Sequence, residues 1–226
     1  MTLGDGRHEI KHIVSYKDLT ELRKRLPLVA KRDENDLYGT GYRVRSLYFD
    51  NYMDKALLEK LNGVNHREKF RLRFYNDNTD FIRLEKKSKR NGLCFKESSV
   101  IIEQECKELL DGNIGILKEN GNPLLLEFYT KVKSELLRPK NIVDYKREAF
   151  VFKAGNVRIT LDYDIRTSAS VKSFLNKELI TVPFTGKAVL EVKYDNFLPE
   201  IIRGITHLSS RQSSAFSKYS TTRTIF

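Results

Sequence analysis

The chain has 226 residues, 40% of them hydrophobic and 11% aromatic, so it can bury its own core and is most simply one domain over residues 1–226. It carries 41 Lys and Arg against 30 Asp and Glu, a net charge of +11, which favours anionic partners such as phosphate chains, nucleotides, nucleic acid or a membrane surface. Two cysteines without metal-ligand spacing exclude a disulfide framework, and no segment approaches the ~20 apolar residues of a membrane span.

The first part of the chain alternates between strand and helix patterns. Residues 7–14 alternate charged with other side chains and predict a strand, and the helix pattern that follows stops at Pro27. Gly63, with the preceding Asn, closes a second helix because glycine tolerates the left-handed conformation at a helix end. The predicted elements are a strand at 7–14, a helix at 16–26, a strand at 42–50 and a helix at 55–61.

The next segment carries the strongest pattern. Residues 67–75 alternate cationic with apolar side chains, so a strand here has one cationic face and one apolar face. Turn residues 76–79 lead into a second strand with the same alternation, and a third strand of the group ends near Glu97. The cations expected on one face of this hairpin are Arg67, Lys69, Arg71, Arg73, Arg83 and Lys87.

The remaining elements follow the same design. Helical patterns occupy 101–110, 123–137 and 199–208, with a loop at 111–122 that could hold one helical turn. Strand patterns occupy 141–152, 157–166 and 187–194, residues 167–185 have the weakest pattern, and 211–219 ends the fold.

Charged strand faces occur in ordinary sheets, where they simply contact water. Here seven or eight strands share the pattern with Arg and Lys concentrated on the charged side, and their mutual repulsion calls for an anion. If the apolar faces pack on outer helices, the charged faces point inward. We therefore predict an α+β fold, a closed antiparallel β-barrel with helices packed outside and a basic tunnel within.

Short motifs in order along the chain carry a family resemblance. The pieces are E-x-K at 9–11, Y-F-D-N at 48–51, R-L-R-F-Y at 71–75, L-E-K-K at 84–87, F-K-E-S at 95–98, Y-K-R-x-A-F at 145–150, R-I-T-L-D at 158–162, V-L-E-V-K at 189–193 and F-S-K-Y at 216–219. With these the chain resembles the catalytic domain of the VTC (vacuolar transporter chaperone) polyphosphate polymerases, which are triphosphate tunnel metalloenzymes. Arg7 stands where the wider superfamily often has the first Glu of E-x-E-x-K, which favours the polymerase branch.

The resemblance implies a set of site residues. Lys60 stands where an Arg is expected, which keeps the charge but loses the planar fork. Glu191 would hold a divalent metal, Mn²⁺ or Mg²⁺, whereas Glu85 is interpreted as a counter-charge. The implied phosphate-binding and catalytic residues are Lys11, Lys60, Arg71, Arg73, Lys87, Lys96, Tyr145, Arg147 and Lys218. Further substrate-binding candidates are Arg45, Arg67, Arg158 and Lys193.

The implied activity is transfer of the γ-phosphate of ATP onto a growing inorganic polyphosphate chain with the help of the metal. Two alternatives stay open: a triphosphatase of the same fold, and a noncatalytic polyphosphate- or RNA-binding module. The expected partners are ATP and polyphosphate rather than DNA. We expect a cytoplasmic protein without a membrane span, which a membrane-protein partner for product export could hold at the inner face of a membrane.

Overall fold

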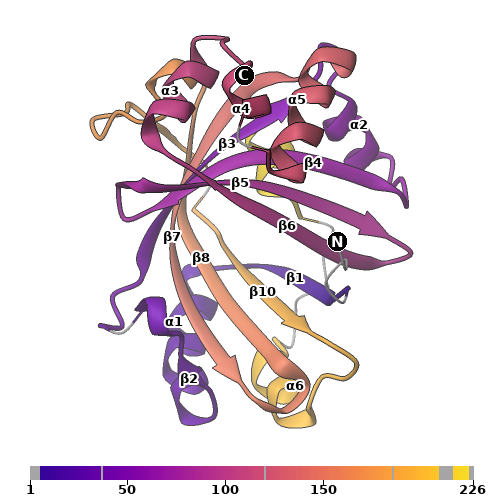
Figure 1. Ribbon diagram of the computed structural model, residues 1–226. Helices are drawn as coiled ribbons and strands as arrows, with labels where there is room; N and C mark the ends of the chain where they lie inside the picture. The colour runs from indigo at the N-terminus through magenta and orange to yellow at the C-terminus, as the bar shows by residue number, and fades with distance from the viewer. Residues whose placement is uncertain (1–5, 37, 120, 185, 209–215, 224–226) are drawn as a thin grey trace.

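The computed structural model describes residues 6–36, 38–119, 121–184, 186–208 and 216–223 (Figure 1). Its main feature is one antiparallel sheet, in which eight strands form a continuous path. In order across the sheet they are β1 (His8–Val14), β10 (Ala188–Tyr194), β8 (Val157–Ser168), β7 (Arg138–Phe152), β3 (Tyr42–Asp50), β4 (Arg67–Tyr75), β5 (Asn78–Arg90) and β6 (Leu93–Ile101). Short strands β2 (Lys31–Arg32) and β9 (Val182–Pro183) pair with β7 and β8.

The sheet curls into a half-barrel that stays open, so the predicted closed barrel is wrong. Its two edge strands, β1 and β6, approach each other at one end. There Arg7 and Cys94 exchange a pair of backbone hydrogen bonds, with N–O distances of 3.1 and 3.0 Å. Among the described residues, β1 and β6 pair through this isolated bridge and do not form a regular ladder.

Helices cover the outer face of the sheet, as Figure 1 shows. The outer helices are α1 (Tyr16–Arg25), α3 (Glu103–Leu110), α4 (Ile116–Glu119), α5 (Pro123–Glu135) and α6 (Glu200–Thr206). Two more, α2 (Lys55–Leu61) and α7 (Lys218–Arg223), contact each other and the inner-face residues. Sequence-local signals place several ends. Ser15 and Asp18 form a reciprocal capping box at the start of α1, and Asn122 caps α5 just before Pro123.

Two apolar cores lie between the outer sheet face and these helices. The first packs α3, α4 and α5 on β3, β4 and β5, with Phe128 against Phe49 and Phe70. The second packs Leu19 and Leu22 of α1, together with α6, on β7, β8 and β10. Burying each such side chain contributes roughly 1.5–3 kcal/mol, so these helices stabilise the curved sheet from outside.

Helix α7 lies on the inner side of the sheet. Tyr219 stacks on Tyr48 with ring centroids 5.1 Å apart, and its hydroxyl donates to Asp50 at 2.7 Å. Thr222 accepts a hydrogen bond from Asn141 at 2.8 Å. These contacts close one side of the half-barrel interior and carry Lys218 into it.

On two strands, charged side chains lie on the opposite face of the sheet from the one that alternation predicts. On β3 the inner face carries Tyr42, Val44 and Tyr48, which places the adjacent Arg45 on the outer face. On β8, Asp164 adopts a left-handed φ of 49° at a register shift, which reverses the alternation beyond Asp162. Ile165 therefore faces inward. Simple alternation along strand 157–166 would put Arg166 on the same inner face as Arg158, but Arg166 lies outside and hydrogen-bonds to Thr181.

Most other predicted elements agree with the structure within one to three residues, and strands 42–50 and 67–75 and helix 55–61 agree fully. The third hairpin strand is the main exception, because it continues to Ile101 and the next helix begins only at Glu103. Of the predicted terminal segment 211–219, residues 211–215 lie outside the described part of the chain.

Candidate functional site

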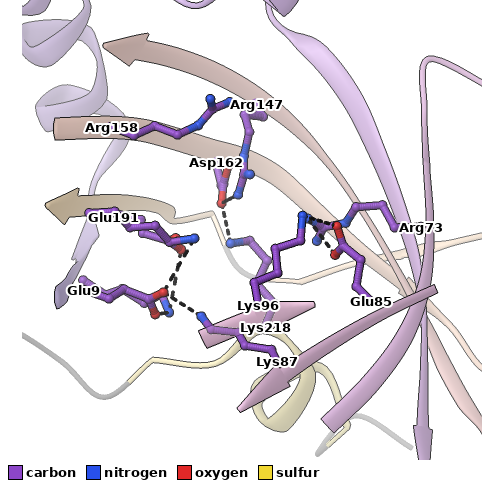
Figure 2. A network of polar contacts seen from close by, with 12 residues as sticks. Glu9, Arg73, Glu85, Lys87, Lys96, Arg147, Arg158, Asp162, Glu191 and Lys218 are labelled. Carbon is purple, nitrogen blue, oxygen red and sulfur yellow. Dashed lines mark hydrogen bonds and ion pairs between the residues drawn. The ribbon is translucent and has the colours of Figure 1, made fainter. Parts of the chain in front are cut away.

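The inner face of the half-barrel encloses a cavity of about 1880 Å³. It brings together all the predicted site residues except Arg45, although they come from all parts of the chain. The predicted residues that line it are Lys11, Lys60, Arg67, Arg71, Arg73, Lys87, Lys96, Tyr145, Arg147, Arg158, Glu191, Lys193 and Lys218. Figure 2 shows how ten of the site's residues lie toward one another.

Arg45 is outside this site, so its prediction as a substrate-binding residue is wrong. Its guanidinium is buried on the other side of the sheet, where it donates to Asp144 at 3.0 Å. It also donates to the backbone carbonyl groups of Phe174 at 3.1 Å and Asn176 at 2.6 Å. Arg45 therefore ties β3 to β7 and to the segment after β8.

One group of cations in the cavity is organised by Glu85. Its Oε2 lies 2.6 Å from Arg71 Nη2 and 3.8 Å from Arg73 Nη1, and its Oε1 lies 2.5 Å from Lys96 Nζ. Burial alone would raise the pKa of Glu85, but Arg71, Arg73 and Lys96 outweigh burial and hold that pKa well below its usual value. Glu85 is thus the counter-charge that the sequence predicts.

A second group forms around Asp162 on β8. Arg147 Nε and Nη2 donate to its two oxygens at 2.6 and 2.8 Å, and Lys218 from α7 contacts the same carboxylate. Burial opposes ionisation of Asp162, whereas Arg147 and Lys218 lower its pKa. The helix that closes the interior is therefore joined to the cavity wall through a shared carboxylate.

The third group joins the carboxylates of Glu9 and Glu191 to lysines (Figure 2). Lys87 Nζ lies 2.6 Å from Glu9, Lys193 Nζ lies 2.9 Å from Glu191, and Lys11 contacts both. Burial and the repulsion between Glu9 and Glu191 would raise their pKa values. The lysines outweigh both effects and lower the pKa of each, so the pair is ionised.

The residues present fit a divalent metal only in a particular way. The described residues contain no group of three or more His, Cys, Asp or Glu side chains that could hold a metal ion by themselves. However, Mg²⁺ and Mn²⁺ commonly use one or two carboxylates together with substrate phosphate oxygens and water. Glu191 with Glu9 beside it could supply the protein ligands of such a site, shared with phosphate, but not an all-protein cage.

Hydroxyl groups complete the middle of the cavity. Arg73 donates to Ser46 Oγ at 2.9 Å and to the Tyr145 hydroxyl at 3.0 Å. Burial raises the pKa of Tyr145 to about 12 despite nearby arginines. Tyr145 is therefore a neutral phenol, and because its oxygen accepts from Arg73, its own O–H can be donated to an anion.

Several residues of the site, among them Glu9, Tyr48, Lys69 and Asp162, were not predicted to have a role in it. Glu9 and Asp162 lie in the quoted motifs, and Lys69 belongs to the predicted cationic face, so the signal for these three was present in the sequence. Tyr48 also lies in a quoted motif, and its hydroxyl accepts from Arg71 at 3.1 Å. Burial raises the pKa of Tyr48, but Arg71, Lys69 and Arg73 outweigh burial and bring that pKa to about 7.

The arrangement leaves an excess of positive charge. Each carboxylate serves two or three cations, so a bound polyanion would find cations from neighbouring strands already positioned around it. Such a cavity can bind a chain of phosphates, align it and neutralise charge that develops on its oxygens.

The chain is similar to known proteins over most of its length. A Bacillus halodurans protein described as a candidate adenylate cyclase is 14% identical, over 84% of this chain and 80% of that chain, with a TM-score of 0.49. The PH1819 protein from Pyrococcus horikoshii OT3 is 11% identical, over 95% of this chain and 96% of that chain, with a TM-score of 0.48. A comparison with curated proteins gave no match. The family model described as VTC domain matches residues 6–226, and the chain therefore belongs to the VTC domain family.

Proposed function

We propose that the protein is a metal-dependent ATP–polyphosphate phosphotransferase, which extends a polyphosphate chain inside the half-barrel cavity. The observation that carries the proposal is the meeting of Arg71, Arg73, Lys87, Lys96 and Arg147 around one cavity. Membership of the VTC family supports the same substrate class. The sheet holds each of these cations in place before substrate binds. The conformational entropy lost in ordering them is therefore lost on folding and not on substrate binding.

Phosphoryl transfer needs the γ-phosphate held in line with the attacking oxygen and its charge neutralised, with little covalent help from the protein. Arg71 and Arg73 lie on the same face of β4 and can donate to neighbouring phosphate oxygens, while Arg147 lines the same cavity from β7. Tyr145 can donate its hydroxyl proton to a phosphate oxygen between them. The terminal phosphate of the acceptor chain is itself the nucleophile, so its position depends on these donors.

Glu191 and Glu9 would hold a divalent cation together with phosphate oxygens. When bound, such a cation supplies charge neutralisation on the leaving group and orients the phosphates. Lys11, Lys87 and Lys193 are paired with these carboxylates, and with a cation bound there each would be able to donate to a phosphate oxygen instead.

The activity test separates three functions that this cavity could perform. Purified protein is incubated with ATP and Mn²⁺, and the products are resolved on a polyphosphate gel. A ladder of acid-stable chains is expected; release of orthophosphate alone would instead mean a hydrolase, and intact ATP a noncatalytic binder. Arg71→Ala should lower the rate by about 10²-fold or more. Lys153→Met, an exposed lysine outside the cavity lining, serves as the matched control.

Whether a helix of the chain could cross a membrane depends on its length and hydrophobicity. Among the described residues, every helix falls short of the length and hydrophobicity needed to cross a bilayer. A membrane-protein partner that receives the product remains part of the proposal.

A further inference from the structure

The cations of the cavity differ in whether a carboxylate neutralises them. Those in the middle each contact Glu9, Glu85, Asp162 or Glu191. At one end the described residues provide no carboxylate within ion-pair distance for four cavity-lining cations, namely Lys60, Arg67, Lys69 and Lys89. Within the described part of the chain, Arg67 donates to the backbone carbonyl of Val64, and Lys69 Nζ lies 3.3 Å from Ser217 Oγ.

These four cations lie close enough to repel one another and their neighbours. Arg67 and Lys89 face each other across β4 and β5. Burial, followed by Arg67, Lys11 and Lys89, lowers the pKa of Lys60. Burial, together with repulsion from Lys87, Lys11 and Arg71, outweighs the opposing effect of Tyr48 and lowers the pKa of Lys69 to about 7. Holding so many like charges together without a counter-ion is unfavourable, so this end is prepared for an anion.

The opposite end of the cavity has a different character. Arg67 and Tyr75 are the two ends of β4, and the eight residue-to-residue steps between them span roughly 26 Å. At the Tyr75 end, Tyr42 packs edge-on against Tyr75 with ring centroids 5.9 Å apart. Arg158, at this end, is paired with Asp33 at 2.5 Å, whereas the exposed Arg83 has no such partner among the described residues.

We propose that the end of the cavity formed by Lys60, Arg67, Lys69 and Lys89 is the subsite for the polyphosphate chain, and that it binds phosphates beyond those that ATP contributes. This inference rests on the proposed function and adds to it the direction in which the chain lies. The nucleoside of ATP then lies toward the Tyr42 and Tyr75 end.

The chemistry of the subsite favours a phosphate chain over a nucleoside. A polyphosphate carries negative charge on every unit, which suits a row of cations that lack carboxylates. A base needs an open aromatic face, and the ring beside Lys69 does not provide one. Tyr48 has Tyr219 stacked on it and the Lys69 ammonium 5.5 Å from its ring centroid. Lys69 also keeps donors free, because it has three N–H groups and contacts one hydroxyl.

The test compares equilibrium binding of two ligands, a long polyphosphate and ATP, by calorimetry without added metal and at one ionic strength. Lys69→Met and Lys60→Met should each weaken polyphosphate binding by roughly tenfold, the value of one charge-assisted contact. The same variants should change ATP affinity by no more than about twofold, whereas Arg71→Ala should weaken both ligands. Lys69→Arg should restore polyphosphate binding because it restores the charge.

Equal losses for the two ligands, or no loss for either, would overturn the inference. Lys153→Met is the matched control, and thermal denaturation shows whether each variant folds. Lys69→Met should fold at least as stably as the wild type because it removes an unpaired cation. The binding experiment does not depend on turnover. A selective loss of polyphosphate affinity in a protein that makes no polyphosphate would therefore keep the subsite and refute the proposed polymerase.

Discussion

Arg147 on β7 and Asp162 on β8 form a two-pronged ion pair, in which Nε and Nη2 donate to separate carboxylate oxygens at 2.6 and 2.8 Å. This pair holds the arginine in a fixed orientation at the cavity wall. Phosphate presents the same kind of forked acceptor, so Asp162 keeps Arg147 in the geometry that a phosphate oxygen would use.

Replacing Asp162 with Asn should separate stability from binding. Arg147 and Lys218 would lose their shared carboxylate, and leaving buried charges uncompensated should lower the free energy of unfolding by about 3 kcal/mol. Added tripolyphosphate should then raise the melting temperature of Asp162→Asn more than that of the wild type. Asp164→Asn, an exposed position on the same strand, is the control. If tripolyphosphate raised the melting temperature of the variant and of the wild type equally, Asp162 would not be the counter-charge that a bound phosphate replaces.

Replacing Glu191 with Gln should abolish metal-dependent turnover while sparing anion binding. In the proposed mechanism this carboxylate holds the metal that neutralises developing charge, so ATP consumption with Mn²⁺ should fall by about 10²-fold or more. Metal-free tripolyphosphate should bind at least as tightly, because a negative charge near Lys11 and Lys193 is removed. Glu178→Gln, exposed and outside the cavity lining, is the matched control. Full activity of Glu191→Gln would exclude the carboxylate as a metal ligand.

Stability should rise with pH above neutrality. Burial and cationic neighbours lower the pKa of Lys69 to about 7, and cationic neighbours outweigh burial to lower the pKa of Tyr48 to about 7. Between pH 7 and 10 the unfolded chain therefore binds more protons at both groups, so unfolding becomes less favourable as pH rises. The slope approaches about 1.4 kcal/mol per pH unit for each proton.

Urea denaturation at several pH values between 7 and 10 measures this slope. Lys69→Met and Tyr48→Phe should each flatten it. Tyr38→Phe should leave it unchanged, since that ring is 92% exposed. A wild-type slope that both cavity variants preserve would show that neither group titrates in this range.

Helix α7 should depend on one hydroxyl. Tyr219→Phe removes the 2.7 Å hydrogen bond to Asp50, and a bond to a charged acceptor is worth roughly 1.5–3 kcal/mol. We expect the free energy of unfolding to fall by about that amount and tripolyphosphate to bind more weakly, because Lys218 begins the same helix. Tyr38→Phe again provides the control. Unchanged stability would mean that α7 is held by packing alone.

The alternation of side chains predicted most strands and nearly all the cavity cations. On β4 the prediction succeeds because Phe70, Leu72 and Phe74 make one face apolar from residue 70 onward, which fixes Arg71 and Arg73 on the other. On β3 each face mixes polar and apolar residues. Arg45 shares its face with the core residue Leu47, so alternation alone cannot say which face is inside.

The features that the sequence did not predict depend on contacts between distant segments. Asp162 becomes the partner of Arg147 through the register of β7 and β8, and of Lys218 through a helix 56 residues later. The left-handed Asp164 reverses the faces of β8 at a single residue. Whether the barrel closes depends on how β1 and β6 meet, which the pattern within each strand does not specify.

The central claim is that side chains on the inner face of the half-barrel bind a chain of phosphates. A crystal structure of the protein with tripolyphosphate tests it most directly. We predict phosphate density inside the cavity, with oxygen atoms in hydrogen-bonding distance of Arg71, Arg73, Lys87 and Arg147. Density confined to the outer surface, with those four side chains still engaged only by Glu9, Glu85 and Asp162 at saturating ligand, would contradict it.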